Sequence, residues 1–184
     1  MAMIRQIQAR YDAEQDRILL RVSRDDDKEF RIWLTRRFLS LILKALNQHL
    51  EIDPDISSQT SPSSKEEVKA FKREQALEQA DFQQPFADSE ESYPIEQTVP
   101  VAFKLNYTLL KDGLLRLQLL PRQGEGLDFV LTSQISISFI EMLTAAGVKG
   151  QWQLTAISSP YTGQGKVQIN CCRLPELWID PVQY

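Results

Sequence analysis

The beginning of the chain alternates between apolar and polar side chains in three short runs. The runs span residues 4–11, 17–24 and 29–34, and polar turns separate them. A period of two is typical of a strand with one buried face, and consecutive strands joined by short turns are typical of an antiparallel meander. The pattern therefore predicts a half-buried sheet of three strands. Its inward side chains are Ile7, Ala9, Tyr11, Ile18, Leu20, Val22, Phe30, Ile32 and Leu34.

An apolar helix is expected directly after the third run. Thr35 is a suitable N-cap, because its hydroxyl can accept a hydrogen bond from a free amide of the first turn. Apolar residues then recur with the spacing of one helical face, which three further leucines widen. We expect such a helix to be buried on more than one side, by a second layer of the chain or by a partner chain. Its apolar residues are Phe38, Leu39, Ile42, Leu43, Ala45, Leu46 and Leu50.

The same order of patterns returns later in the chain. Three alternating runs span residues 101–109, 114–120 and 127–131. Thr132 follows as an N-cap, 97 residues after Thr35, and Leu143 lies at the same distance from Leu46. The second helical face consists of Ile135, Phe139, Ile140 and Leu143 and ends near Gly147. We interpret the repeat as an internal duplication. Few identities survive at this offset, so a chance similarity is the alternative interpretation.

These patterns predict an α+β fold of two pseudo-repeated units plus a C-terminal hairpin, each unit being a three-stranded antiparallel meander followed by a helix. Residues 1–52 would form the first βββα unit and residues 53–98 an acidic, partly helical linker. Residues 99–184 would form the second βββα unit with the hairpin and a tail, and the whole would pack as one compact domain.

The linker and the C-terminal region carry weaker patterns. Ser64 and Glu67 have the spacing of a capping box, which predicts a charged helix as far as about Phe82. We interpret this helix as a solvated connector, with a partner-binding helix as the alternative. Alternation over residues 151–157 and 166–172 predicts the C-terminal hairpin.

Charge is unevenly distributed along the chain. The net charge is −4, but residues 51–100 hold 4 Lys and Arg against 12 Asp and Glu, a net −8. The flanking segments are therefore neutral to mildly basic, so the overall acidity does not exclude nucleic acid as a ligand. Apolar runs fall short of the ~18 residues that a membrane span requires. The adjacent Cys171 and Cys172 point to opposite faces of a predicted strand, which favours a reducing, cytoplasmic location.

The chain lacks the common signatures of catalysis. It has no GxGxxG, GxxxxGK[ST] or GxSxG motif, and His49 is its single histidine. We interpret His49 as packing near a helix end and Asp25 to Asp27 as a solvated turn rather than a cation site. The sequence therefore predicts a protein that is not an enzyme, with no catalytic residue, metal or cofactor. An enzyme built on scattered carboxylates would need a deep pocket that contains acids with displaced pKa values.

The outward face of the first sheet is the main candidate for binding. It carries four arginines around a tryptophan, and Arg116 lies at a corresponding position of the second unit. Cations that follow phosphates and a flat ring that stacks on a base are how several single-strand binders work. The alternative is that the arginines only keep an exposed sheet soluble. The candidate residues are Arg10, Arg17, Arg21, Arg31, Trp33 and Arg116.

Arg36 and Arg37 are unfavourable at the start of a helix, where the dipole is positive. Their position indicates either a ligand that they bind or a neighbouring acidic segment such as residues 86–91.

The order of two βββα units is similar to the architecture of the PUR and Whirly-type single-stranded nucleic-acid binders. Units of those proteins generally have four strands before the helix, where this chain has three. The resemblance is one of architecture and includes no shared motif, and it implies a single-stranded nucleic acid as the ligand.

The sequence thus predicts a non-enzymatic binding or scaffold protein. A protein partner or self-association is expected, including a homodimer through the apolar helices, and no membrane association. The alternative is a single-stranded nucleic-acid-binding protein that uses the arginine and tryptophan face. The alternative predicts salt-sensitive affinity, because bound cations release counterions from phosphates.

Overall fold

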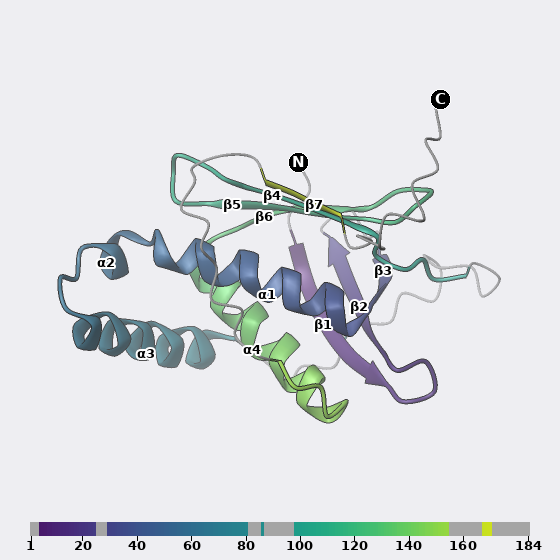
Figure 1. Ribbon diagram of the computed structural model, residues 1–184, viewed down its shortest axis with the longest axis horizontal. Coiled ribbons are helices and arrows are strands. Elements are labelled where there is room, and N and C mark those ends of the chain that lie inside the picture. The colour runs from purple at the N-terminus through teal and green to yellow at the C-terminus, as the bar shows by residue number, and fades with distance from the viewer. Residues whose placement is uncertain (1–3, 25–28, 81–85, 87–97, 155–166, 171–184) are drawn as a thin grey trace, which may run out of the picture.

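The computed structural model describes residues 4–24, 29–80, 86, 98–154 and 167–170. The protein is an α+β fold with two antiparallel sheets, β1-β2-β3 and β6-β5-β4-β7. The elements are β1 (Ile4–Asp12), β2 (Arg17–Arg24), β3 (Glu29–Leu34), α1 (Arg36–Glu51), α2 (Pro54–Ser57), α3 (Pro62–Gln79), β4 (Lys104–Leu109), β5 (Leu115–Leu120), β6 (Leu127–Leu131), α4 (Ser133–Lys149) and β7 (Val167–Asn170). In Figure 1 the second sheet forms the upper layer, and α1 lies beneath it.

The three strands predicted for the beginning of the chain are confirmed as β1, β2 and β3. Their register places Ile18 opposite Leu34 and Leu20 opposite Ile32, so the apolar side chains line up on one face. Ile18, Leu20 and Leu34 have no exposed surface. Alternation alone thus identified the buried face of this sheet.

Thr35 is the N-cap of α1, as predicted. Its Oγ1 accepts a hydrogen bond from the amide of Phe38 at 3.3 Å. The apolar face of α1 packs against both sheets and α4 in one continuous core. A second layer of the same chain therefore covers this face. The α1 residues with no exposed surface include Phe38, Leu39, Ile42, Ala45 and Leu46.

The second sheet begins later than the alternation suggests. The predicted strand of residues 101–109 is shortened to β4, which starts at Lys104. The preceding residues pair with the first sheet instead: Trp33 donates its amide to Pro100 O at 2.8 Å, and Ala102 donates to Trp33 O at 2.9 Å. Ala102 is consequently buried, while Val101 is half-exposed.

Thr132 is the N-cap of α4, as predicted, and its Oγ1 accepts from the amide of Ile135 at 3.3 Å. The helix continues past Gly147 to Lys149. Its predicted inward face needs one correction, because Ile135 is 39% exposed. Ser136 and Ile137 are buried in its place, since the first turn of α4 points them toward the core.

The helix of the acidic segment also differs from its prediction. It starts at Pro62, and its N-cap is Ser61, whose Oγ accepts from the amide of Ser64 at 3.0 Å. Ser64 therefore lies inside the helix, because Pro62 suits the first helical position. Phe71, a large apolar residue of this helix, is 65% exposed. Helix α3 contacts α4, and its Ala76 is buried. An ion pair between Arg73 Nε and Glu141 Oε1, 2.7 Å apart, also joins the two helices.

The predicted C-terminal hairpin lies mostly outside the described residues. Residues 151–154 are described and form no strand, while β7 pairs antiparallel with β4. The segments 25–28, 81–85, 87–97, 155–166 and 171–184 lie outside the described residues, and with them the Asp25–Asp27 turn, Phe82, Cys171 and Cys172.

Candidate functional site

The outer face of the first sheet brings several of the predicted binding residues together. Arg21 on β2 lies opposite Arg31 on β3. In the next row, Leu19 lies between Arg10 on β1 and Trp33 on β3. Since alternate strand residues share a face, these three arginines and the tryptophan form one surface.

Glu29 binds two of these arginines. Its Oε1 accepts from Arg21 Nε at 2.7 Å and from Arg31 Nε at 2.6 Å. Glu29 is only 5% exposed. Burial alone would raise the pKa of Glu29, but the hydrogen bonds and charges of the two arginines outweigh it and lower the pKa. The carboxylate therefore stays ionised and neutralises part of the positive charge on this face.

Arg21 has further contacts within the chain. Its guanidinium lies 4.2 Å from the centre of the Phe86 ring and donates to Gln8 Oε1 at 3.4 Å. Only 13% of the Arg21 side chain is exposed, against 28% for Arg31. Both arginines thus stabilise the sheet through contacts within the chain, and Arg21 is largely shielded from a ligand.

Arg10 and Arg17 are the remaining cations of this face. Arg10 is exposed near the end of β1, and Arg17 is half-buried at the start of β2, opposite Asp12. Within the described residues, neither side chain has a recorded hydrogen bond or ion pair. Trp33 is half-buried and lies on the same face as Arg10, with β2 between the two residues.

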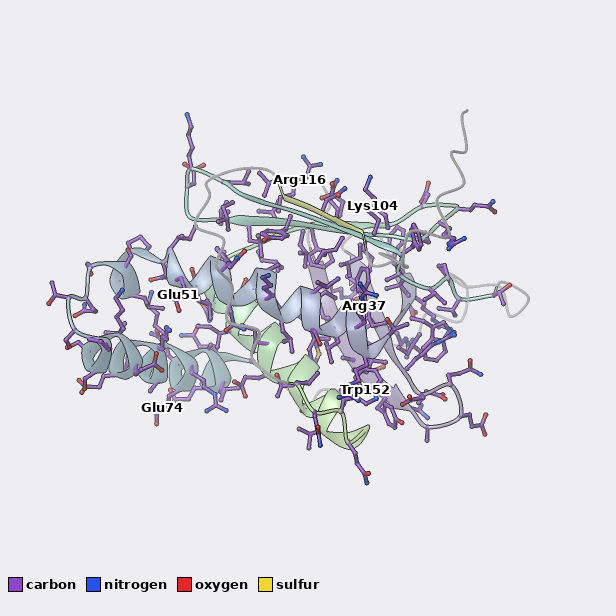
Figure 2. All side chains as sticks on the ribbon, viewed as in Figure 1. Arg37, Glu51, Glu74, Lys104, Arg116 and Trp152 are labelled. Atoms are coloured by element: carbon purple, nitrogen blue, oxygen red, sulfur yellow. The ribbon has the colours of Figure 1, made fainter. Side chains whose placement is uncertain are left out.

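Arg116 lies apart from this surface, on the outer face of the second sheet (Figure 2). It makes a two-pronged contact with Asp128, with Nε–Oδ1 at 3.0 Å and Nη2–Oδ2 at 2.6 Å. Gln118 donates to the same carboxylate at 2.9 Å. The hydrogen bond from Arg116, more than the one from Gln118, lowers the pKa of Asp128. Asp128 thus neutralises Arg116 within the sheet.

His49 is a buried structural side chain, which agrees with its interpretation as packing. It has no exposed surface, and its ring nitrogens lie 2.9 Å from Ser136 Oγ and 2.8 Å from Gly113 O. A carbonyl oxygen can only accept, so Nε2 carries a proton and donates to Gly113. Both nitrogens are engaged, which leaves no free ring nitrogen for a substrate.

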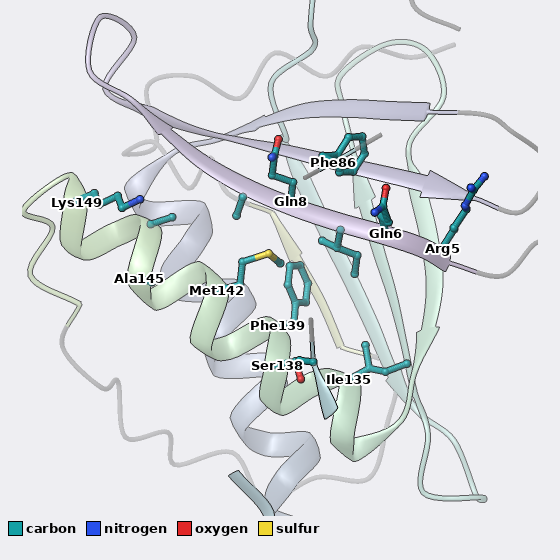
Figure 3. Close-up of a pocket in the computed structure, with 14 residues that line it drawn as sticks. Arg5, Gln6, Gln8, Phe86, Ile135, Ser138, Phe139, Met142, Ala145 and Lys149 are labelled. Carbon is teal, nitrogen blue, oxygen red and sulfur yellow. The ribbon is translucent and has the colours of Figure 1, made fainter. Parts of the chain in front are cut away.

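A groove between β1 and α4 was not anticipated from the sequence (Figure 3). It has a volume of about 510 Å³ and is called the β1 groove below. The polar side chains come mainly from β1, and α4 supplies an apolar floor. Arg5 and Lys149 lie at opposite ends in Figure 3. Its lining includes Arg5, Gln6, Ile7, Gln8, Ala9, Phe86, Ile135, Phe139, Met142, Ala145 and Lys149.

The β1 groove runs along an edge strand. In the part of the chain that the structure describes, β1 pairs only with β2. An edge strand presents a row of unpaired amides and carbonyls that can pair with another strand. Alternation reveals which side chains face inward but not which strand lies at the edge, so no pattern in the sequence predicts this site.

A second cavity lies where the two sheets meet. It has a volume of about 560 Å³ and is called the basic cavity below. Two arginines line it, Arg37 from the first turn of α1 and Arg122 from the loop after β5. Arg36, by contrast, donates to Gln153 O at 3.2 Å. The unfavourable position of Arg37 at the start of a helix was the one feature of the sequence that pointed to a ligand at this cavity. The lining consists of Thr35, Arg37, Pro100, Val101, Ala102, Phe103, Pro121, Arg122 and Gln123.

Metal-ligating clusters of three or more His, Cys, Asp or Glu are absent from the described residues. Among the described helices, none is both long and apolar enough to cross a membrane. Comparisons with protein-family models, with curated proteins and with solved structures gave no significant match. The chemistry of the surfaces described above therefore carries the functional conclusion.

Proposed function

We propose that this protein is a non-enzymatic binding protein that takes an extended peptide segment of a protein partner along the β1 groove. The observation that carries the proposal is that one edge of β1 has no pairing strand among the described residues and lies beside an apolar floor on α4. In this mode of recognition the peptide adds a strand to the sheet, and its main chain supplies most of the affinity.

The floor of the groove suits alternating side chains. Ile135, Met142 and Ala145 line it from α4, and Ile135 is 39% exposed although it is a large apolar residue. Every second side chain of an added strand would point toward α4, and the others would point toward solvent. We therefore expect the partner segment to alternate apolar and polar residues.

Positive charge beside the groove favours acidic residues in the partner segment. The charged side chains that line the described part of the groove are Arg5 and Lys149, and both are cations. An acidic residue at the Lys149 end of a bound peptide would meet an exposed cation there, while Arg5 already has an interaction within the chain. Complementary charge of this kind raises the association rate and disfavours basic segments.

Several observations support a binding role without chemistry. Neither the β1 groove nor the basic cavity has a carboxylate among its described lining residues. The carboxyl groups with shifted pKa values include Asp16, Glu29, Asp53 and Asp128, and each pKa is lowered. A catalytic acid at neutral pH needs a raised pKa instead.

The test uses fluorescent peptides in which valine alternates with serine between terminal glutamates. Fluorescence anisotropy should report binding of the alternating peptide, and a scrambled peptide of the same composition should bind far less. Hydrogen exchange should show that the peptide protects amides of β1 selectively. The recovered peptide should have an unchanged mass, because the proposal includes no reaction.

Ala145→Glu is the diagnostic variant, because Ala145 is exposed and its replacement places a carboxylate on the floor. We expect peptide affinity to fall at least about tenfold through repulsion and filling of the groove. Ala70→Glu, an exposed alanine of α3, is the matched control and should bind normally. Equal binding by both variants, or a cleaved peptide, would contradict the proposal. Concentration-dependent dimers lost only in Ala145→Glu would identify a second copy as the occupant.

Single-stranded nucleic acid is the second candidate ligand. The observation that favours it is the row of Arg10, Leu19 and Trp33, where an exposed cation lies on the same face as a half-buried ring. Labelled single-stranded DNA and RNA should then bind at low salt and dissociate as salt rises. Arg10→Ala with Trp33→Ala should abolish the binding. An unchanged affinity in this double variant would exclude the outer face of the first sheet.

We also propose that the two βββα units arose by duplication. Thr35 and Thr132 both cap the helix that follows a third strand, and both accept from the amide three residues later at 3.3 Å. A cytoplasmic location is proposed from the adjacent cysteines of the sequence. Expression with a fluorescent tag and microscopy would test it.

A further inference from the structure

We propose that the basic cavity binds a small organic phosphate monoester, at a site separate from the β1 groove. The cavity lies between the start of α1, residues 100–103 and the loop of residues 121–123. Its volume of about 560 Å³ is in the range of small-molecule sites. Three distant segments of the chain thus meet around a space that a compact ligand fits.

Arg122 is held ready for an anion. Its guanidinium lies 4.5 Å from the centre of the Phe103 ring. A stacked guanidinium keeps its N–H donors at the edge of the stack, where they can bind two oxygens of one phosphate. Stacking also fixes the side chain before the ligand arrives, so less conformational entropy is lost on binding.

Arg37 supplies the second cation. It is exposed, and no hydrogen bond or ion pair is recorded for it within the described residues. A cation in the first turn of a helix is repelled by the positive end of the helix dipole, and a bound anion would relieve this repulsion. Figure 2 shows Arg37 at the end of α1 that starts the helix.

The two arginines select a doubly charged ligand. No acidic residue is among the described residues that line the cavity. A phosphate monoester carries a charge of about −1.5 to −2 at neutral pH, which matches two guanidinium groups. A carboxylate or a phosphodiester carries only one negative charge and matches less well.

The rest of the cavity suits an organic group. Pro100, Val101, Ala102 and Pro121 give it apolar walls. Pro100 and Ala102 are fixed by backbone hydrogen bonds with Trp33 at 2.8 and 2.9 Å. A wall anchored in this way is preformed, so a flat or compact apolar group can pack against it without rearrangement.

Isothermal titration calorimetry tests the site with phenyl phosphate and AMP as probes, at low and at physiological salt. Both probes should bind, more weakly at higher salt. Phenol and adenosine, which lack the phosphate, should bind at least about tenfold more weakly. Benzoate, which keeps the ring but carries one charge, should also bind more weakly than phenyl phosphate.

Arg37→Gln and Arg122→Gln should each reduce phosphate-probe affinity by about tenfold or more, because each removes a charge-assisted contact. Lys111→Gln is the matched control, since it removes one positive charge from an exposed turn outside the cavity, and this variant should bind the phosphate probes normally. Circular dichroism and thermal unfolding would show that all three variants remain folded.

Several results would overturn the proposal. The proposal fails if phenyl phosphate and AMP do not bind folded protein even at low salt, or if Lys111→Gln weakens their binding as much as the two cavity variants do. Benzoate that binds as well as phenyl phosphate would contradict the selection of a dianion. An oligothymidylate that binds through Arg37 and Arg122 while both small probes do not would assign the cavity to a nucleic-acid strand.

Discussion

Trp152 donates a hydrogen bond from its indole Nε1 to Asp16 Oδ1 at 3.0 Å, across 136 residues of sequence. Tyr11 donates its hydroxyl to the same oxygen at 2.9 Å, and the Tyr11 and Trp152 rings meet edge to face at 5.8 Å. Asp16 has a φ of 46°, a left-handed conformation that aspartate tolerates in turns. The first hairpin is therefore bound to the turn that follows α4.

Replacing Trp152 with Phe should lower the melting temperature by roughly 2–4 °C, because the ring packing stays and one hydrogen bond is lost. The hydrogen bond from Trp152 is the main reason why the pKa of Asp16 is lowered, so this pKa should rise in the variant. NMR titration measures the pKa, and calorimetry measures the melting temperature. Trp33→Phe is the control; an equal rise of the Asp16 pKa there would contradict the assignment.

Glu29→Gln should change how stability depends on pH. Because the pKa of Glu29 is lowered on folding, its contribution is present above the ordinary value of 4.5 and is lost as pH falls through the folded pKa. At neutral pH the free energy of unfolding of the variant should be lower by on the order of 2 kcal/mol. This loss is smaller than for a fully buried ion pair, because both arginines are partly exposed.

Urea unfolding at several pH values measures this effect. The difference between wild type and Glu29→Gln should shrink as pH falls below 4.5, where the unfolded wild type takes up a proton, and should vanish once folded Glu29 is also protonated. Glu67→Gln, an exposed glutamate of α3, should show little difference at any pH. A constant difference across the acid range would show that the charge of Glu29 is not the cause.

His49→Phe should destabilise the protein by about 2–3 kcal/mol, because Gly113 O and Ser136 Oγ lose their partner in the interior. Urea unfolding measures the change. Asn47→Ala, at an exposed position of α1, should cost no more than about 0.5 kcal/mol. Similar losses for both variants would mean that the buried hydrogen bonds add little.

Gly126→Ala should destabilise the protein by about 2–3 kcal/mol. A Cβ at this position would lie 2.5 Å from the backbone oxygen of Leu119, which cannot move without disturbing β5. Gly124→Ala is the comparison, because a Cβ there meets open space but its φ is +88°. That variant should cost about 1 kcal/mol from backbone strain alone. The reverse order of the two losses would refute the packing argument.

Thr35→Ala and Thr132→Ala should each cost about 1 kcal/mol through loss of an N-cap. If the two units are equivalent, the two losses should be alike, and the double variant should show their sum. Thr60→Ala, at an exposed position between α2 and α3, serves as the control. Unfolding free energies from urea titration decide the comparison, and a negligible loss for one cap alone would argue against equivalent units.

The sequence revealed those features that depend on neighbouring residues. Alternation identified the strands of the first sheet, and the position of a threonine after a strand identified both N-caps. Such signals are local, because side-chain direction and capping are set within a few residues. Ser61 shows the limit of this approach, since Ser64 offered a similar capping pattern three residues later.

Features that join distant segments were not predicted. The arginines of the outer face were correctly placed on one surface, but nothing in the alternation showed that Glu29 would be buried between Arg21 and Arg31. The basic cavity likewise depends on Arg37 and Arg122 lining one cavity from distant parts of the chain. Register and tertiary packing determine such contacts, and these follow from the whole chain rather than from a local pattern.

The pairing of Trp33 with Pro100 and Ala102 has a consequence for the assembly of the chain. The residues that lead into the second sheet also complete the edge of the first, so neither half possesses all of its own pairing partners. Two fragments separated within the acidic segment would each expose an unsatisfied edge. They should therefore remain unstable alone and recover the native fold by complementation when mixed.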